Sequence, residues 1–214
     1  EHIRQRRLIN KGFTPLRVRQ LIPHIRQLTN EIVDQIQERG EIDFVEDFAI
    51  HVPLIIICEM MGLPPEQRKD MYRWSDAMMA GDGHVEADSP QLLAAAEAFG
   101  EYCVLAIQLI EERRLDPKDD LISILTQAFD AGDLAKEHKA YQGVSEEALA
   151  KMAENDQLKD DELLAFLTVL LVAGNETTRN ALTGGITALS RFPEQKQLLL
   201  DNLQDESFMD KAAD

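Results

Sequence analysis

The sequence contains few cysteines, and this shortage excludes several kinds of site. Its two cysteines, Cys58 and Cys103, stand far apart in apolar surroundings, without the CxxC or paired Cys/His spacing of a zinc site. We therefore expect two buried thiols rather than a disulfide. We also expect no metal ligand within the chain.

Basic residues are also scarce. The 214 residues include 22 Lys and Arg against 39 Asp and Glu, a formal net charge of −17. A nucleic-acid-binding surface needs basic side chains for phosphate contacts, so no nucleic-acid partner is expected. Residues 1–39 are the exception, with eight basic and four acidic residues. This basic segment indicates either solvated helix faces or a docking patch for an acidic partner.

Long uncharged apolar runs are missing as well. The longest, 163–173, is much shorter than the roughly 20 residues that a membrane-spanning helix needs. The first residues are charged, unlike a secretory signal. We therefore expect a cytoplasmic protein without a membrane span.

Alternation of strand type is nearly absent, and apolar residues recur at helical spacing, so the fold class is mainly α. Proline starts, polar caps and glycine stops predict helices over 15–39 with a stop at Gly40, 48–61, 65–80, 91–114, 121–129 and 160–191. Either Asp119 or Asp120 caps the fifth helix. The first segment is one helix or a kinked pair, and Pro53 either kinks the second helix or marks its first turn. Residues 130–158 are polar and glycine-containing, which indicates a mobile excursion with one short helix.

The helix over 160–191 is the most informative segment. Its first half, 163–172, is apolar on all sides, which predicts a central helix surrounded by protein. Residues 173–178 then read Ala-Gly-Asn-Glu-Thr-Thr. An interior glycine costs roughly 1 kcal/mol relative to alanine, and a buried acid costs more unless it is paired. The small residues leave room beside the backbone, and Thr177 can bond the carbonyl of Ala173 and bend the helix. Such a groove can hold a small polar ligand against a planar group and supply it with protons.

The hexapeptide resembles the oxygen-activation motif in the long I helix of cytochromes P450. Flanking segments resemble that family in the same order: residues 1–8 and 13–15 its C helix and exit, 120–129 the helix before the I helix, 160–163 the start of the I helix and 190–195 its end. The resemblance spans the chain and implies a partial P450 fold with a long central I helix.

The resemblance implies a haem-thiolate monooxygenase that holds heme b and hydroxylates a lipophilic, possibly steroid-like, small molecule with O2 and ferredoxin electrons. It makes Glu176 and Thr177 the catalytic pair. The other residues that it assigns are His2, Arg6, Ala173, Gly174 and Thr177 at the haem, Val169, Val172 and Ala173 at the substrate, and Arg4, Arg7 and Lys11 at the ferredoxin.

The family's ExxR helix and its iron-binding cysteine loop are absent from these residues. We therefore expect 1–214 to be a single partial P450 catalytic domain, inactive by itself. Two alternatives stay open. One is a peroxide-driven P450, although such members tend to lack the acid–alcohol pair. The other is a non-catalytic, all-helical ligand-binding or interaction domain whose pocket is lined by Met71, Met78 and Met79.

Overall fold

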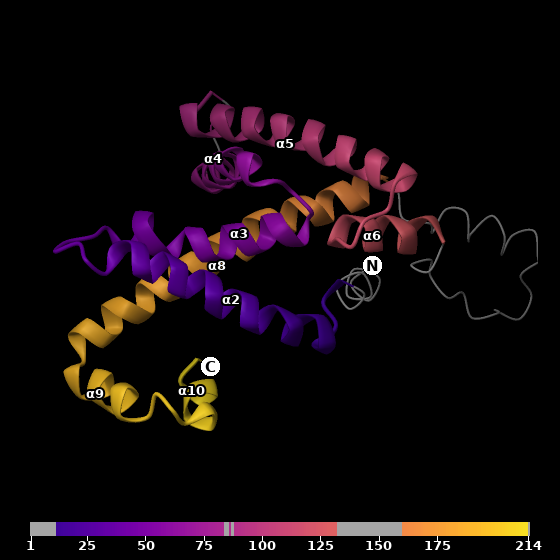
Figure 1. Cartoon of the computed structure of the whole chain (residues 1–214). Coiled ribbons are helices and arrows are strands. Elements are labelled where there is room, and N and C mark those ends of the chain that lie inside the picture. The colour runs from indigo at the N-terminus through magenta and orange to yellow at the C-terminus, as the bar shows by residue number, and fades with distance from the viewer. Residues whose placement is uncertain (1–11, 84–85, 87, 132–159, 214) are drawn as a thin grey trace, which may run out of the picture.

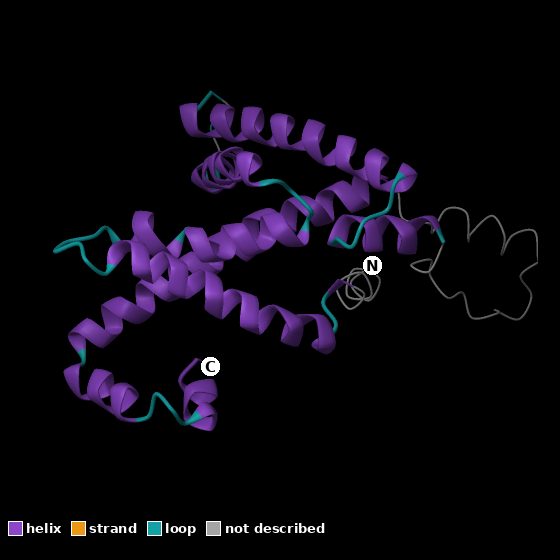
Figure 2. Cartoon of the chain, viewed as in Figure 1, coloured by secondary structure: helices purple, strands orange, loops and turns teal. Residues whose placement is uncertain are grey.

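The computed structural model describes residues 12–83, 86, 88–131 and 160–213. Helices and short turns make up this part of the chain, and no strand occurs in it (Figure 1, Figure 2), which confirms the mainly α class. The helices are α2 (Pro15–Ile36), the π-helix η1 (Val45–Ala49), α3 (His51–Met60), the 3-10 helix η2 (Pro65–Gln67), α4 (Arg68–Ala80), α5 (Pro90–Leu115), α6 (Leu121–Asp130), α8 (Asp160–Arg191), α9 (Pro193–Asp201) and α10 (Glu206–Ala213).

Three helices begin at side-chain caps. The hydroxyls of Thr14 and Ser89 each accept a hydrogen bond from the amide three residues ahead, at 3.3 and 3.2 Å, and each cap is followed by proline. At α6 the cap is Asp120 and not Asp119, because Asp120 Oδ1 accepts a 2.7 Å bond from the third amide. These bonds satisfy amides that the first turn leaves without a partner.

The helix ends differ from the sequence-based prediction by a few residues. α2 continues through Pro23 and ends at Ile36, ahead of the predicted stop at Gly40. The segment predicted as one helix over 48–61 is instead the π-helical turn η1 followed by α3, with Pro53 in the first turn of α3. Proline is tolerated there because a first-turn amide has no intrahelical partner to lose.

α8 is the longest described helix and crosses the middle of the molecule (Figure 1). It contacts η1, α3, α4, α5 and α9, and α2 lies outside it against α3 and η1. The core contains apolar side chains from α3, α4, α5, α6 and α8: Leu54, Ile57, Cys58, Met71, Trp74, Ala98, Tyr102, Ala106, Leu121, Leu125, Leu163, Leu167 and Leu171.

The described part of the chain covers one face of α8 and leaves the other open. Leu163, Leu167 and Leu171 recur every fourth residue and are fully buried, whereas Val169 is 61% exposed. Within the described residues, close packing covers the leucine face, whereas α4 and α5 approach the Val169 face only around an open pocket.

α5 meets the length and hydropathy criteria for crossing a bilayer, with a mean hydropathy of 1.5 over its best 18 residues, and no other described helix does. The sequence-based expectation considered uncharged runs and passed over α5, because Glu97 and Glu101 interrupt it. α5 packs against α4 and α6 and buries Ala98, Tyr102 and Ala106. Only 28% of that 18-residue window is buried, so α5 packs in the core along one face and leaves apolar side chains such as Leu93 and Val104 exposed on another.

A buried ion pair joins α5, the α3–η2 turn and α6. Arg113 Nε lies 2.5 Å from Asp120 Oδ2, and both side chains are at most 3% exposed. Arg113 Nη2 also donates to the carbonyl of Gly62 at 3.3 Å. Gly62 has a φ of +72°, and a Cβ at this position would overlap the Asp120 carboxylate. Glycine is therefore required by both the backbone and the neighbouring charge.

Arg114 holds the end of α6 beside the start of α8. Its Nη2 lies 2.6 Å from Asp160 Oδ1 and its Nε 3.2 Å from Asp130 Oδ2. The hydrogen bond from Arg114 lowers the pKa of Asp160. The predicted polar excursion over 130–158 lies outside the described residues except for its first two positions, 130 and 131, which complete and cap α6.

Candidate functional site

The side chains of 173–178 point to different sides of α8. Ala173, Thr177 and Thr178 are exposed, Gly174 and Glu176 are half-buried, and Asn175 is fully buried. The alcohol of Thr177 and the acid of Glu176 therefore diverge, which follows from the roughly 100° that separates consecutive residues on a helix.

The Thr177 hydroxyl donates a hydrogen bond to the carbonyl of Ala173. This contact was expected, but it does not distinguish Thr177, because other hydroxyls along α8 bond the carbonyl four residues before them in the same way: those of Thr168, Thr178, Thr183, Thr187 and Ser190. What sets Thr177 apart is its place. It lies four residues, about one turn, after the exposed Ala173 and eight after Val169 on the open face.

Both carboxylate oxygens of Glu176 have partners on α8 itself. Oε2 forms an ion pair with Arg179, and Oε1 accepts a 3.0 Å hydrogen bond from Asn180 Nδ2. The Glu176 and Arg179 side chains are only 13% and 14% exposed. Arg179 also lies 3.4 Å from Asp76 Oδ1 on α4. The acid is thus the paired, nearly buried carboxylate that a helix interior tolerates.

Gly174 faces α3 rather than the open side of α8. A Cβ on Gly174 would lie 2.6 Å from Ile57 Cδ1. The missing side chain of Gly174 therefore permits close packing of α3 on α8. Within the described residues, the free space that the sequence predicted beside the α8 backbone lies at Ala173 and not at Gly174.

This packing predicts that two glycine-to-alanine changes in α8 alter the stability of the fold in opposite directions. Gly174→Ala is expected to destabilise the fold by about 1 kcal/mol, because overpacking Ile57 outweighs the better helix propensity. Gly184→Ala, where no described atom lies within 4 Å of the added methyl, is expected to stabilise it by about 0.5–1 kcal/mol. Urea unfolding of both variants measures the difference. A stabilising Gly174→Ala would contradict the close approach.

Asn175 is a feature that the sequence-based reasoning missed. Its side chain is fully buried, and its Nδ2 donates a 3.0 Å hydrogen bond to Ser75 Oγ on α4. Its position continues the spacing of Leu163, Leu167 and Leu171, so an amide on an otherwise apolar face was the available signal.

All three residues predicted to contact substrate lie in one apolar pocket of about 510 Å³. The pocket is open to one side and is bounded by α4, α5 and α8; its lining residues are Met78, Leu92, Ala95, Ala96, Phe99, Thr168, Val169, Val172 and Ala173. Of the three methionines in the alternative hypothesis, Met78 lines this pocket and Met71 is fully buried in the core. The pocket suits a lipophilic ligand.

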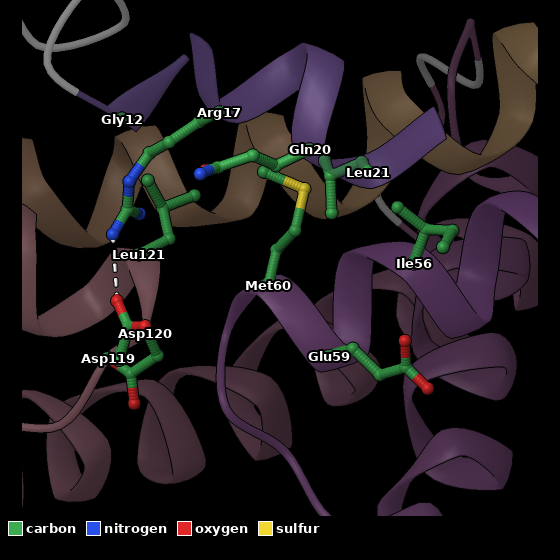
Figure 3. A pocket seen from close by; sticks show the side chains of 10 residues that line it. All are labelled: Gly12, Arg17, Gln20, Leu21, Ile56, Glu59, Met60, Asp119, Asp120 and Leu121. Atoms are coloured by element: carbon green, nitrogen blue, oxygen red, sulfur yellow. Dashed lines mark hydrogen bonds and ion pairs between the residues drawn. The ribbon is translucent and has the colours of Figure 1, made fainter. Parts of the chain in front are cut away.

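A second pocket of about 230 Å³ lies between α2, α3 and the start of α6 (Figure 3). Arg17 reaches across its mouth to Asp119 at 2.9 Å, and Gln20 and Met60 extend into it. None of its lining residues comes from α8. It is therefore separate from the motif at 173–178.

Neither cysteine has the character of a metal ligand. Cys58 is fully buried, and burial raises the pKa of its thiol to about 11. Cys103 is half-buried, not fully buried as expected, and its partial burial also raises its pKa. Both shifts disfavour the thiolate, which is the form that binds a metal. Within the described part of the chain, no group of three His, Cys, Asp or Glu side chains is placed to hold a metal ion.

The remaining predicted site residues lie outside the described residues. These are His2 and Arg6, expected at a haem propionate, and Arg4, Arg7 and Lys11, expected at a redox partner. Their roles stay predictions.

The chain matches known proteins both in sequence and in fold. The sequence model described as "Cytochrome P450" matches residues 1–206. Among curated relatives, cytochrome P450 CYP107DY1 of Priestia megaterium is 33% identical over 94% of this chain and 43% of its own length. A steroid C26-monooxygenase of Mycobacterium tuberculosis is 36% identical over 92% of this chain and 47% of its own.

Solved structures give the same answer. CYP109E1 from Bacillus megaterium, solved in complex with testosterone, superposes with a TM-score of 0.75 at 29% identity, covering 95% of this chain and 47% of that one. The chain thus spans less than half the length of these relatives. Together with the long central helix and its motif, these matches show that the chain belongs to the cytochrome P450 family.

Proposed function

We propose that the protein containing these residues is a cytoplasmic haem-thiolate monooxygenase that hydroxylates a lipophilic small molecule with O2 and electrons from a ferredoxin. The observation that carries the proposal is the open face of α8. Val169 and Ala173 on this face line the apolar pocket, and Thr177 lies one turn beyond them. A bound apolar molecule would therefore lie beside the alcohol of the motif.

The open face of α8 fits a haem. Ala165, Val169, Ala173 and Thr177 form an exposed stripe at intervals of four residues, small enough for a flat group to lie against the helix. Heme b, when bound, supplies the iron at which O2 is reduced. Ala173, Gly174 and Thr177 would contact it, with Gly174 contributing backbone only, because its Cα faces Ile57. Because Cys58 is a buried core thiol and neither Cys58 nor Cys103 stands in a glycine-rich loop, neither is expected to be the axial ligand.

Thr177 and Glu176 would divide the proton chemistry between them. The Thr177 hydroxyl could exchange its bond to the Ala173 carbonyl for one to O2 or to a water on the open face. Glu176, on another side of the helix, would carry protons from solvent.

The basic segment is proposed to serve two partners. His2 and Arg6, four residues apart, would share one helix face and grip a haem propionate. Arg4, Arg7 and Lys11 would dock the acidic surface of a ferredoxin, an interaction that salt should weaken. The steroid C26-monooxygenase relative and the testosterone-bound structure favour a steroid-like substrate.

The test compares two threonines that make the same hydrogen bond. In the full-length protein, Thr177→Ala is expected to divert roughly tenfold more of the reducing equivalents into peroxide, because a methyl group cannot hold the oxygen ligand or order a water. Thr187→Ala, which loses the equivalent bond to the carbonyl of Thr183, should leave coupling unchanged. NADH consumed, peroxide formed and product formed are measured for each variant, with testosterone as the probe substrate.

If the two variants direct the same fraction of NADH electrons to product, then Thr177 has no role in the mechanism beyond its hydrogen bond within the helix. Testosterone binding without any oxygen consumption by the parent protein would instead favour the alternative, a ligand-binding domain without redox chemistry.

A further inference from the structure

Both oxygens of the Glu176 carboxylate are occupied by partners on α8 in the arrangement seen here. One of its carboxylate oxygens is paired with Arg179, and the other accepts the hydrogen bond from Asn180. The side chain is 13% exposed. To carry protons, the carboxylate must first leave the guanidinium of Arg179.

Separating Glu176 from Arg179 is unfavourable because of the charge that remains on Arg179. Its side chain is 14% exposed, and a guanidinium stays charged at any ordinary pH. Departure of Glu176 would leave a nearly buried cation without a counter-ion, which is strongly unfavourable. A second carboxylate within reach removes this obstacle.

Asp76 on α4 is that second carboxylate. Its Oδ1 lies 3.4 Å from Arg179 Nη1, a looser contact than the pairing of Nη2 with Glu176. The Asp76 side chain is 52% exposed, so it can approach the guanidinium without a change in its helix. The two nitrogens of Arg179 thus face two carboxylates on two helices.

The helices that carry these groups are fixed to each other at the neighbouring residues. Asn175, next to Glu176, donates its buried amide hydrogen bond to Ser75, which precedes Asp76. Tyr72, one turn earlier on α4, lies in the same cluster: burial, and then the charge of Asp76, raises its pKa. The remaining groups that act on Tyr72 are Glu46 on η1, Arg179 and Glu176.

We propose that Asp76 is a positioning residue for Glu176, one that accepts Arg179 and so frees the acid of the motif to carry protons. The proposal rests on the proposed function of Glu176 and adds a residue on another helix to it. No proton passes through Asp76; its part is to move the guanidinium. Asp76 is not among the residues that line the apolar pocket, so substrate affinity should not depend on it.

The experiment uses the full-length protein with ferredoxin, ferredoxin reductase and saturating testosterone. Asp76→Asn keeps the shape but not the charge, and is expected to slow oxygen consumption roughly tenfold, less than loss of a general acid itself costs, because Glu176 remains. The dissociation constant for testosterone, from equilibrium dialysis, should stay within twofold, and Asp76→Glu should restore the rate. Arg179→Lys should also be slow, because an ammonium lacks the fork that faces two carboxylates.

Glu176→Gln separates this inference from the proposed function. If Glu176 carries protons and Asp76 acts through it, then Glu176→Gln is slow and the double variant with Asp76→Asn is no slower. A slow Glu176→Gln beside an Asp76→Asn at the parental rate would overturn the role of Asp76 and leave that of Glu176 intact. If the two substitutions together slow oxygen consumption by the product of their separate effects, the role of Asp76 is also overturned, because Asp76 would then act independently of Glu176. A parental rate in Glu176→Gln itself would refute the proposed role of the acid, and the inference with it.

Discussion

Asp120→Ala is expected to destabilise the fold by about 3–5 kcal/mol, because it leaves the buried Arg113 guanidinium with only a 3.5 Å contact to the half-exposed carboxylate of Glu112. The two side chains are 3% and 2% exposed and 2.5 Å apart, so water cannot replace the lost carboxylate. The change also removes the cap of α6, since the other oxygen of Asp120 accepts from the Ser123 amide. Urea unfolding followed by circular dichroism measures the loss.

The neighbouring residue provides a matched control. Asp119 is 96% exposed and pairs with Arg17, so Asp119→Ala should change stability by less than about 1 kcal/mol. A double variant, Asp120→Leu with Arg113→Met, should recover much of the lost stability, because it removes both charges and not one. Equal effects of Asp119→Ala and Asp120→Ala would show that the pair is not buried in solution.

Leu167→Ala is expected to cost about 2–5 kcal/mol, the range for a leucine removed from a packed core. Leu167 is fully buried on the face of α8 that meets its neighbouring helices, and truncation leaves a cavity that rigid helices fill poorly. Val169→Ala, two residues along, removes a side chain that is 61% exposed, and should cost less than about 1 kcal/mol.

Denaturant unfolding of both variants in this chain tests whether α8 has one buried face. Similar, large losses for Leu167→Ala and Val169→Ala would mean that protein also covers the open face, as the apolar sequence first suggested. A small loss for Leu167→Ala would place α8 outside the core.

The sequence by itself determined the helices and the family. Proline after Thr14 and Ser89 marked two helix starts, because these residues satisfy the chemistry of a first turn wherever they stand. The run at 173–178 determined the family resemblance, since glycine, acid and alcohol together in a helix interior are costly without a function. Such features are local, and a local pattern can be recognised in the sequence before the packing of the helices is known.

Only the tertiary structure decided what each side chain of the motif meets. The pairing of Glu176 with Arg179 is local to α8, but the tertiary structure brought in Asp76, which is distant in sequence. It buried Asn175 against Ser75 and turned Gly174 toward α3. It also placed Asp120, and not Asp119, against the buried guanidinium of Arg113. The physical reason is common to all of these: helical periodicity predicts which residues share a face, but the neighbour that a face meets depends on how separate helices pack.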